Sequence, residues 1–322
     1  ALYAAKVYSN MAPEAEHALH MPSHIFVQLG MWEKVAKSNQ RAYDASVAWV
    51  ERKRASVTKR DFHALAWLQY AHLQMGHYDK AKACIALIEP IATRENTTSQ
   101  IKATYANMKT RYLLESERWN DIPISPDALS KNRYSGDAIE LLALGTKAAK
   151  TDDLETAAQV ENRLAVLQGQ DASGLKSEVQ GQVTLEDLKR TVGISHREVA
   201  AWIRLREGRP EEALGYVKEA LAIEAEMHPS YGPPEPIKPP QELYGEILLE
   251  LGRTQEAAAQ FEEMQIRFPN RTQSILGAAQ AAVKKGDAAK ARRYYKHLLK
   301  IWDDTSQSPG LQEAKQYLAS SE

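Results

Sequence analysis

Two segments near the C-terminal end of the chain repeat one pattern at a fixed interval, and this repeat constrains the fold more than any other feature. Thirty-four residues separate Gly252 from Gly286, and five residues after each glycine stands an alanine, Ala257 or Ala291. Amphipathic stretches with helical spacing lie on both sides of each glycine. Helix pairs joined at a glycine and repeated at this interval are typical of a solenoid of helical hairpins. The spacing therefore predicts an all-α fold.

The same turn pattern occurs at three earlier glycines. These pairs are Gly30 with Trp32, Gly76 with Tyr78, and Gly208 with Pro210. The glycine relieves strain where the first helix ends, and the aromatic residue or proline starts the second helix. Weaker copies of the pattern lie around Trp119 and Leu154. We therefore expect helical hairpins along most of the chain.

Composition and charge exclude two classes of function. Hydrophobic residues make up 43% of the chain and charged residues 26%, which agrees with a helical protein that folds in water. The formal net charge of -1 gives no basic field for nucleic-acid binding. No apolar run approaches the roughly 18 residues of a membrane-spanning helix. Because Cys84 is the only cysteine, no disulfide can form within the chain, and both the cytoplasm and a bacterial periplasm stay open as compartments.

On these turns the chain resembles the tetratricopeptide repeat (TPR) family, whose hairpins carry small and aromatic residues at these positions and often end in proline. The resemblance covers most of the chain and is irregular. It implies a right-handed α-solenoid of TPR-like helical hairpins with a concave groove. It implies no particular activity.

Three stretches are also similar to a longer bacterial group of irregular TPR proteins that carry another helical half upstream. These stretches are HALHMPSHIF, DFHALAWLQYAHLQMG and the segment from GPPEP to LLELG. The chain starts directly in ALYAAKVYSNMAPEA, which has the spacing of a second repeat helix. We therefore expect it to be the C-terminal part of a longer chain.

The repeat spacing also predicts how the chain is organised. Irregular hairpins with a histidine-rich groove are expected over 1–170, a flexible insertion over 171–182, and C-terminal hairpins over 183–322. The proline-rich stretch 228–240 predicts a loop, because proline lacks the backbone N–H that a helix interior needs and restricts the residue before it.

Three histidines in the segment EHALHMPSHIF form the second notable feature. His17, His20 and His24 are spaced three and four residues apart, which places their imidazoles on one stripe of a helix. Pro22 lies within this stripe and predicts a kink, because it removes one helical hydrogen bond. Counted back from Gly30, the three histidines occupy positions that in the TPR family face the concave groove.

The same count from Gly76 places His63 at an equivalent position of the next repeat. Packed helices lie about 8–10 Å apart, so His63 is expected to reach toward the histidine stripe. Four imidazoles that face one space predict a site for a divalent transition metal: zinc, copper, nickel or iron. The alternative is that these histidines are surface residues or contacts for a peptide.

The remaining groove positions follow from the same repeat count, except Tyr231, which belongs to the proline-rich loop. They are Tyr70, Asn107, Arg111, Glu198, Trp202, Arg206, Tyr231, Glu242, Glu246 and Glu250. The three glutamates of the last repeat make one end of the groove acidic, which would select a partly cationic peptide or small molecule, with Trp202 as a hydrophobic anchor. Tyr231 and its loop would act as a lid over this end. A solvated helical face is the alternative.

The sequence thus leaves two functions open. The first is a non-catalytic TPR scaffold that binds a protein, a peptide or a small ligand in its groove. The second is a metal-binding protein or metal-dependent enzyme that uses His17, His20, His24 and His63. No phosphate-binding loop, nucleophile elbow or cysteine cluster supports another chemistry. The identity of the ligand and the oligomeric state are not readable from the sequence.

Overall fold

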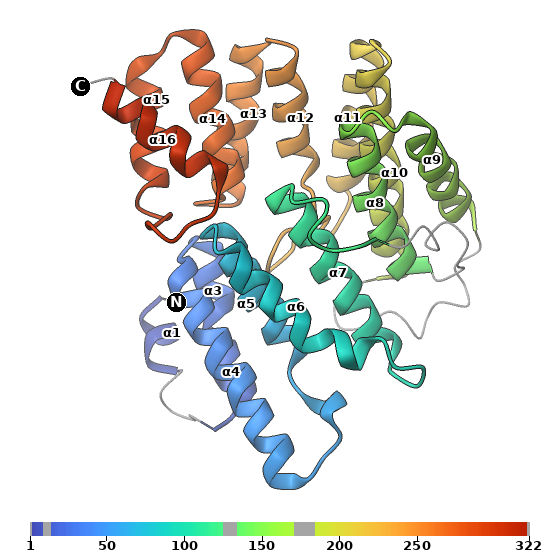
Figure 1. Ribbon diagram of the computed structural model, residues 1–322, viewed down its shortest axis with the longest axis vertical. Helices are drawn as coiled ribbons and strands as arrows, with labels where there is room; N and C mark the ends of the chain where they lie inside the picture. The colour runs from blue at the N-terminus through green and yellow to red at the C-terminus, as the bar shows by residue number, and fades with distance from the viewer. Residues whose placement is uncertain (1, 9–13, 125–133, 171–183, 321–322) are drawn as a thin grey trace. The chain divides into compact units, whose positions relative to one another are not determined.

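The chain is all-α. The computed structural model describes residues 2–8, 14–124, 134–170 and 184–320, and within these ranges it contains helices and no β-strand (Figure 1). The fold class expected from the repeat spacing is therefore confirmed. None of the described helices combines the length and the apolar character that a membrane crossing requires.

The residues group into two compact units. Unit 1 comprises residues 1–108, 231–233 and 261–322, and unit 2 comprises residues 109–230 and 234–260. The insertion expected over 171–182, which was to separate two sets of hairpins, lies outside the described residues.

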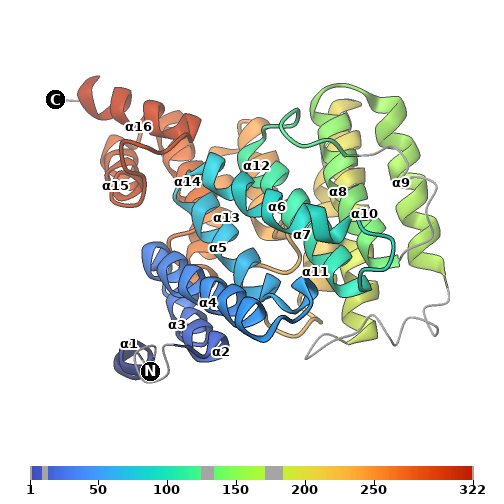
Figure 2. The same cartoon turned by 60° about the horizontal axis from the view of Figure 1, so that its bottom comes forward.

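Unit 1 holds most of the N-terminal and C-terminal helices. They are α1 (Leu2–Tyr8), α2 (Glu16–His20), α3 (Pro22–Gln28), α4 (Trp32–Lys53), the 3₁₀ turn η1 (Val57–Lys59), α5 (Phe62–Gln74), α6 (Tyr78–Ala92), the first part of α7 (Ser99–Ser116), the last part of α13 (Thr254–Arg267), α14 (Thr272–Lys285), α15 (Ala288–Leu298) and α16 (Pro309–Ser320). Helix α4 packs against α2, α3 and α5, and Figure 2 shows α4 beside α5.

Unit 2 holds the middle helices. They are the last part of α7, α8 (Tyr134–Lys150), α9 (Leu154–Gly169), α10 (Leu185–Arg206), α11 (Pro210–Glu224), α12 (Pro240–Glu250) and the first part of α13. Helix α10 packs against α8, α9, α11 and α12, so it forms the centre of this unit. Residues 228–239 form no helix, and α12 begins at Pro240.

The five turn glycines share one geometry. Gly30, Gly76, Gly208, Gly252 and Gly286 all have the left-handed backbone, with φ between 60° and 78°. In each turn the residue after the glycine donates its N–H to the carbonyl five residues earlier, at 2.8–2.9 Å. This is the hydrogen bond of a Schellman helix end, and the left-handed residue there is usually glycine. The hairpin turns expected from the sequence are therefore present.

Small residues sit where the two helices of a hairpin approach each other. Ala81, Ala157, Ala213, Ala257 and Ala291 all have no exposed surface. A larger side chain at these positions would force the backbones apart, because packed cores have little free volume. Four of these alanines stand five positions after a turn glycine, and Ala157 stands five positions after Asp152, which also has a left-handed backbone.

Proline breaks the helix that carries the histidine stripe. Helix α2 ends at His20, and α3 begins at Pro22, with Met21 between them. The kink expected at Pro22 is thus a full break into two short helices. Proline suits the first position of α3, where no helical hydrogen bond from its nitrogen is required.

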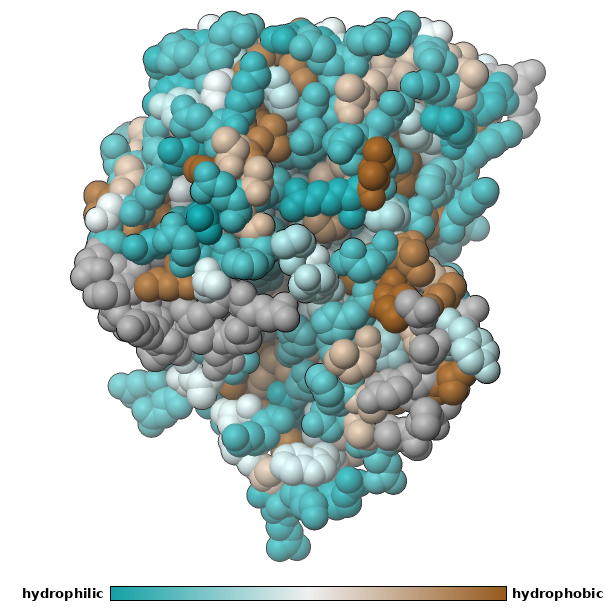
Figure 3. Space-filling view, turned by 180° about the vertical axis from the view of Figure 1, so that it is seen from behind, coloured by the Kyte–Doolittle hydropathy of each residue, from teal (hydrophilic) through white to brown (hydrophobic). Residues whose placement is uncertain are grey.

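Some large apolar side chains of the described residues are exposed. The face in Figure 3 is mainly hydrophilic, with small hydrophobic groups between polar residues. Tyr231 and Ile266 are among the most exposed, at 62% and 76%. Isolated exposed apolar residues are ordinary in folded proteins and do not by themselves mark a site.

Candidate functional site

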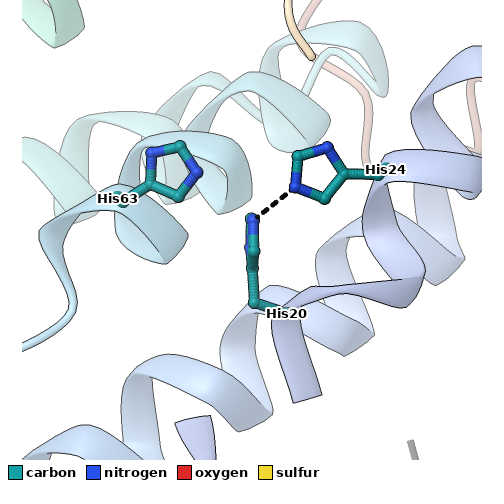
Figure 4. Close-up of side chains that lie close together, drawn as sticks. All are labelled: His20, His24 and His63. Carbon is teal, nitrogen blue, oxygen red and sulfur yellow. Dashed lines mark hydrogen bonds between the residues drawn. The ribbon is translucent and has the colours of Figure 1, made fainter. Parts of the chain in front are cut away.

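Three of the four predicted histidines converge in unit 1, and we call His20, His24 and His63 the histidine cluster. His20 at the end of α2 is buried, His24 on α3 is partly buried, and His63 in the first turn of α5 is exposed (Figure 4). The ring centroids of His20 lie 5.0 Å from His24 and 4.7 Å from His63. One ring nitrogen from each lies within 4.8 Å of the other two.

Local structure explains how these rings meet. Asp61 caps α5 by accepting the N–H of Ala64 at 2.9 Å, which places His63 in the first turn of that helix. Trp67 follows His63 by one turn. Its ring lies 4.8 Å from His20, 4.5 Å from His24 and 5.4 Å from His63 between centroids. The indole is therefore an apolar wall that all three imidazoles share.

Gly232 lets the backbone of residues 231–233 approach the Trp67 ring. A Cβ atom at Gly232 would lie 2.4 Å from the Trp67 ring, so no side chain fits there. The close approach brings the Tyr231 carbonyl oxygen to 3.1 Å from His24 Nδ1. The backbone of Tyr231 thus contacts the cluster.

Hydrogen bonds assign the tautomers of two of the imidazoles. The Asn39 amide nitrogen donates to the Val35 carbonyl at 2.8 Å, so the Asn39 oxygen is the atom that faces His20 Nδ1 at 2.7 Å. His20 Nδ1 must therefore carry the hydrogen and donate. His24 Nδ1 must also donate, because its partner is the Tyr231 carbonyl oxygen.

The two remaining nitrogens point at each other. His20 Nε2 and His24 Nε2 lie 3.2 Å apart, as the dashed line in Figure 4 shows. In neutral imidazoles with hydrogen on Nδ1, both Nε2 atoms carry lone pairs. Burial, together with His63, lowers the pKa of His20 to about 3 although the Asn39 hydrogen bond raises it, so this ring is neutral at pH 7. The contact needs a proton or a cation between the two lone pairs.

His17 lies apart from this convergence. Its side chain is exposed near the start of α2, and it is not among the three residues whose nitrogens lie together. Its position one turn before His20 still places it on the same stripe.

Two other predicted groove residues of unit 1 are placed differently from each other. Tyr70 is 1% exposed; its hydroxyl accepts from Arg271 Nη1 at 3.2 Å, and its ring packs on Trp32. Tyr70 is thus part of the core. Asn107 on α7 is half-buried.

Arg111 holds the proline-rich loop in unit 2. Its side chain is buried, and it donates to the Pro234 carbonyl at 3.0 Å and to the Glu235 carboxylate at 3.2 Å. Because a buried guanidinium needs such partners, this contact explains why an arginine on α7 is found inside the unit.

The glutamates at the predicted acidic end of the groove pair with cations of unit 2. Lys238 donates to Glu242 at 3.0 Å and also to Glu246, and Arg206 donates to Glu250 at 2.6 Å. Glu242 is completely buried. These carboxylates are therefore paired with cations of the same unit, which weakens the field that they present to a ligand.

One hollow in unit 2 collects several of the predicted residues, and we call it the Glu198 pocket. It is lined by Leu114, Glu117, Trp119, Thr146, Lys150, Glu198, Trp202, Lys238, Leu243 and Glu246. Trp202 is 3% exposed, and the ammonium of Lys150 lies 4.6 Å from the centre of a Trp202 ring. Such a position is favourable, because the aromatic face attracts cations.

Glu198 is unusual among the residues of this pocket. It is 1% exposed, and neither carboxylate oxygen has a hydrogen-bond partner. Burial raises the pKa of Glu198 well above its usual value, opposed by Lys238 and reinforced by Glu224 and Glu246. Repeat spacing grouped Glu198 with Trp202 and Glu246, which line the same hollow, but it could not show that the carboxyl is buried.

Sequence reasoning missed the residues that support both sites. Trp67 lies four positions after His63, so helical spacing alone places it on the same face. Asn39 reaches His20 through packing over 19 residues, and no local pattern marks it. Lys238 stands four residues before Glu242, a spacing at which oppositely charged side chains can pair.

Left-handed glycine turns join successive helices at five places in the described part of the chain, which gives it a TPR-like helical-repeat fold. No family model and no curated protein sequence matches the chain. Among solved structures it is similar to a tetratricopeptide repeat protein from Parabacteroides merdae, with 11% identity and a TM-score of 0.46, over 94% of this chain and 97% of the other. It is also similar to the hetero-tetramer Cut9-Hcn1 of the APC/C, with 10% identity and a TM-score of 0.35, over 94% of this chain and 62% of the other.

Proposed function

We propose that this TPR-like protein binds a divalent transition metal through His20, His24 and His63. The observation that carries the proposal is the 3.2 Å contact between two Nε2 atoms whose rings both donate through Nδ1. Two lone pairs at this distance repel each other unless a positive centre lies between them. A metal ion that accepts both lone pairs turns this repulsion into coordination.

The surrounding hydrogen bonds support a metal more than a shared proton. Histidines that ligate metals usually donate their other N–H to a carbonyl or carboxylate, which fixes the tautomer. Here Asn39 and the Tyr231 carbonyl hold His20 and His24 in this way. A proton bridges only two nitrogens, whereas the nitrogen of His63 also lies within 4.8 Å of the other two.

The distances suit a small tetrahedral ion. Nitrogen ligands about 2.0–2.1 Å from a tetrahedral zinc lie about 3.3–3.4 Å from one another. The 3.2 Å contact between His20 and His24 is close to this value. Because His63 is exposed, its side chain has the freedom to complete the set. Imidazole ligands also suit copper, nickel and iron, so the element follows from measurement.

The chemistry of the site depends on what completes it. Three protein ligands leave a position for water or for a substrate oxygen, which is the arrangement of catalytic zinc. His17 lies on the same stripe, and as a fourth ligand it would close the site into a structural one. An active enzyme and a structural metal protein are thus separated by one coordination position.

Metal loading of the purified, untagged chain tests this proposal. After incubation with Zn²⁺ or Co²⁺ and removal of excess ion, we expect close to one metal per chain, and a Co²⁺ spectrum of a tetrahedral nitrogen site. His24→Ala and His63→Ala should each weaken binding by more than about 100-fold, because each removes a ligand. His297→Ala in α15 of the same unit is the matched control and should bind normally.

Two outcomes would overturn the metal proposal. One is a wild-type chain that retains no metal after loading. The other is equal affinity in the wild type and in both ligand variants. His63 is exposed, so a folding defect is not expected to obscure the result for His63→Ala, and circular dichroism checks this.

Binding of a protein or peptide is a second proposed function, favoured by the repeated TPR-like hairpins, since α-solenoid repeats present extended surfaces to partners. Tyr231 is the exposed aromatic residue among the expected groove positions, at 62%. If it anchors a partner, Tyr231→Ser should reduce recovery of one identified partner in cross-linking, while His63→Ala should not. Equal recovery with both variants would remove Tyr231 from this proposal.

A further inference from the structure

The Glu198 pocket contains a polar group with no partner, and this group points to a ligand that neither the fold nor the histidine cluster implies. Both oxygens of a carboxyl that is 99% buried lack a hydrogen bond. Leaving such a group unsatisfied costs about 1–3 kcal/mol, and more when it is charged. Groups of this kind are rare in folded proteins unless a ligand or water satisfies them.

We propose that the Glu198 pocket binds the ammonium group of a primary alkylamine. The hollow measures about 300 Å³ when the open space at its mouth is counted, and its enclosed part is about the size of one water molecule. An ammonium group is of that size and has three donors. It can donate to Glu198 while its alkyl chain leaves through the mouth.

Charge in the pocket favours a cation. The groups that act on Glu198 most strongly are Lys238, Glu224 and Glu246, so two further carboxyl groups and one ammonium surround it. Lys238 already donates to Glu242 and Glu246. Lys150, at the other side of the hollow, is paired with Glu117. An ammonium ion beside Glu198 compensates the negative charge that this carboxyl gains when it ionises, and the two further carboxyl groups add to the attraction for a cation.

Aromatic and aliphatic side chains favour an alkyl stem on this cation. Trp119, Trp202, Leu114 and Leu243 line the hollow beside the charged groups. An inorganic cation would leave these surfaces in contact with water, whereas an alkylamine covers them. Tryptophan faces also attract ammonium groups as they enter. The lining is thus amphipathic in the same way as the proposed ligand.

Binding changes the protonation of Glu198. Burial raises the pKa of this carboxyl well above its usual value, so the folded protein holds the proton to a higher pH than an exposed glutamate does. An alkylammonium ion pairs with the ionised form, so the carboxyl proton passes to the solvent as the ion pair forms. Binding is therefore expected to release up to one proton per ligand and to strengthen as the pH rises, until the amine itself loses its proton.

Calorimetric titration with n-propylammonium chloride tests the proposal on the full chain. We expect saturable binding, with a heat that depends on the ionisation enthalpy of the buffer because a proton is released. Glu198→Gln should weaken binding at least tenfold and abolish the proton release. Glu250→Gln is the matched control, since Glu250 pairs with Arg206 and does not line the pocket. n-Propanol, which has the same length and no charge, should not bind.

A free amine and a lysine side chain share this chemistry, and a second titration separates them. Lysine blocked at its amino and carboxyl groups should bind as well as propylammonium if the pocket receives lysine side chains, and more weakly if its mouth admits only a free amine. Absence of saturable binding by both compounds would overturn the proposal. So would equal binding by the wild type and Glu198→Gln, with folding of the variant checked by thermal unfolding. Neither result affects the metal test, which uses residues of unit 1.

Discussion

The histidine cluster of unit 1 and the Glu198 pocket of unit 2 both hold polar groups away from water, but they differ in which of these groups have partners. In the cluster, the Nδ1 atoms of His20 and His24 donate hydrogen bonds to Asn39 and to the Tyr231 carbonyl, and the two Nε2 atoms face each other. In the pocket, Lys238 pairs with Glu242 and Glu246, and only the carboxyl of Glu198 is left without a hydrogen bond among the pocket's described acidic groups. Charge in the pocket is mostly balanced, whereas the cluster gathers lone pairs.

This difference shows which residues of a repeat surface are informative. Positions on one helix face were expected to form an open groove, but Tyr70, Arg111, Glu198, Trp202 and Glu242 are buried. A buried polar group needs a hydrogen-bonding or charged partner. This partner is either another residue of the protein or a ligand. The groups that lack partners, and not the whole stripe, mark the candidate sites.

Replacement of Lys238, which pairs with the buried Glu242, should have the largest effect on stability. Lys238→Met leaves Glu242 buried with less positive charge beside it, so the free energy of unfolding should fall by about 3–5 kcal/mol. Urea denaturation of this variant and of Lys218→Met, an exposed lysine of unit 2, measures the effect. A loss below about 1 kcal/mol would show that the pairing of Lys238 contributes little.

Replacement of Asn39 should weaken metal binding by the histidine cluster. Asn39→Leu removes the acceptor that holds the His20 tautomer, and we expect Zn²⁺ affinity to fall by about 10–100-fold. A competition titration against a chromophoric chelator measures this, with Gln40→Leu on the exposed side of α4 as control. Asn39→Asp keeps an acceptor and should recover part of the affinity; failure of this recovery would indicate that Asn39 acts only in packing.

Replacement of Glu198 should stabilise the protein. Glu198→Met removes an unsatisfied buried carboxyl, so the free energy of unfolding at neutral pH should rise by about 1–3 kcal/mol. Because the folded protein holds the proton of Glu198 above the pKa of the unfolded chain, the wild type loses stability as the pH rises from about 4.5. The advantage of the variant should therefore grow over this range in denaturation curves. An advantage that does not change with pH would contradict a neutral, buried Glu198.

A histidine outside the cluster should give the smallest effect. Burial, together with His77 and Lys80, lowers the pKa of His72 to about 4. The unfolded chain therefore binds a proton at this residue between pH 6.5 and about 4 while the folded chain does not, and stability falls as the pH decreases through this window. His72→Gln should remove this part of the pH dependence, as seen in thermal unfolding across the window. A pH dependence equal to that of the wild type would exclude His72 as a contributor.

Helical spacing and turn chemistry were enough to predict the hairpins and part of each site. Glycine is the residue that most easily takes the left-handed backbone of a helix end, so Gly30 and Gly76 predicted the turns at their positions. The three-and-four spacing brought His20 and His24 onto one side, and the repeat count brought His63 to them. The same count joined Glu198, Trp202 and Glu246.

Contacts between residues far apart in the chain decided the rest. Arg271 places the Tyr70 hydroxyl in the core from 201 positions away, and the Tyr231 carbonyl reaches His24 from 207 positions away. The sequence by itself determined which residues share a helix face and where each helix ends, because both depend on neighbours within a few residues. Only the tertiary structure decided which faces are buried and which polar atoms keep a free lone pair, because burial and pairing depend on every helix that packs against them.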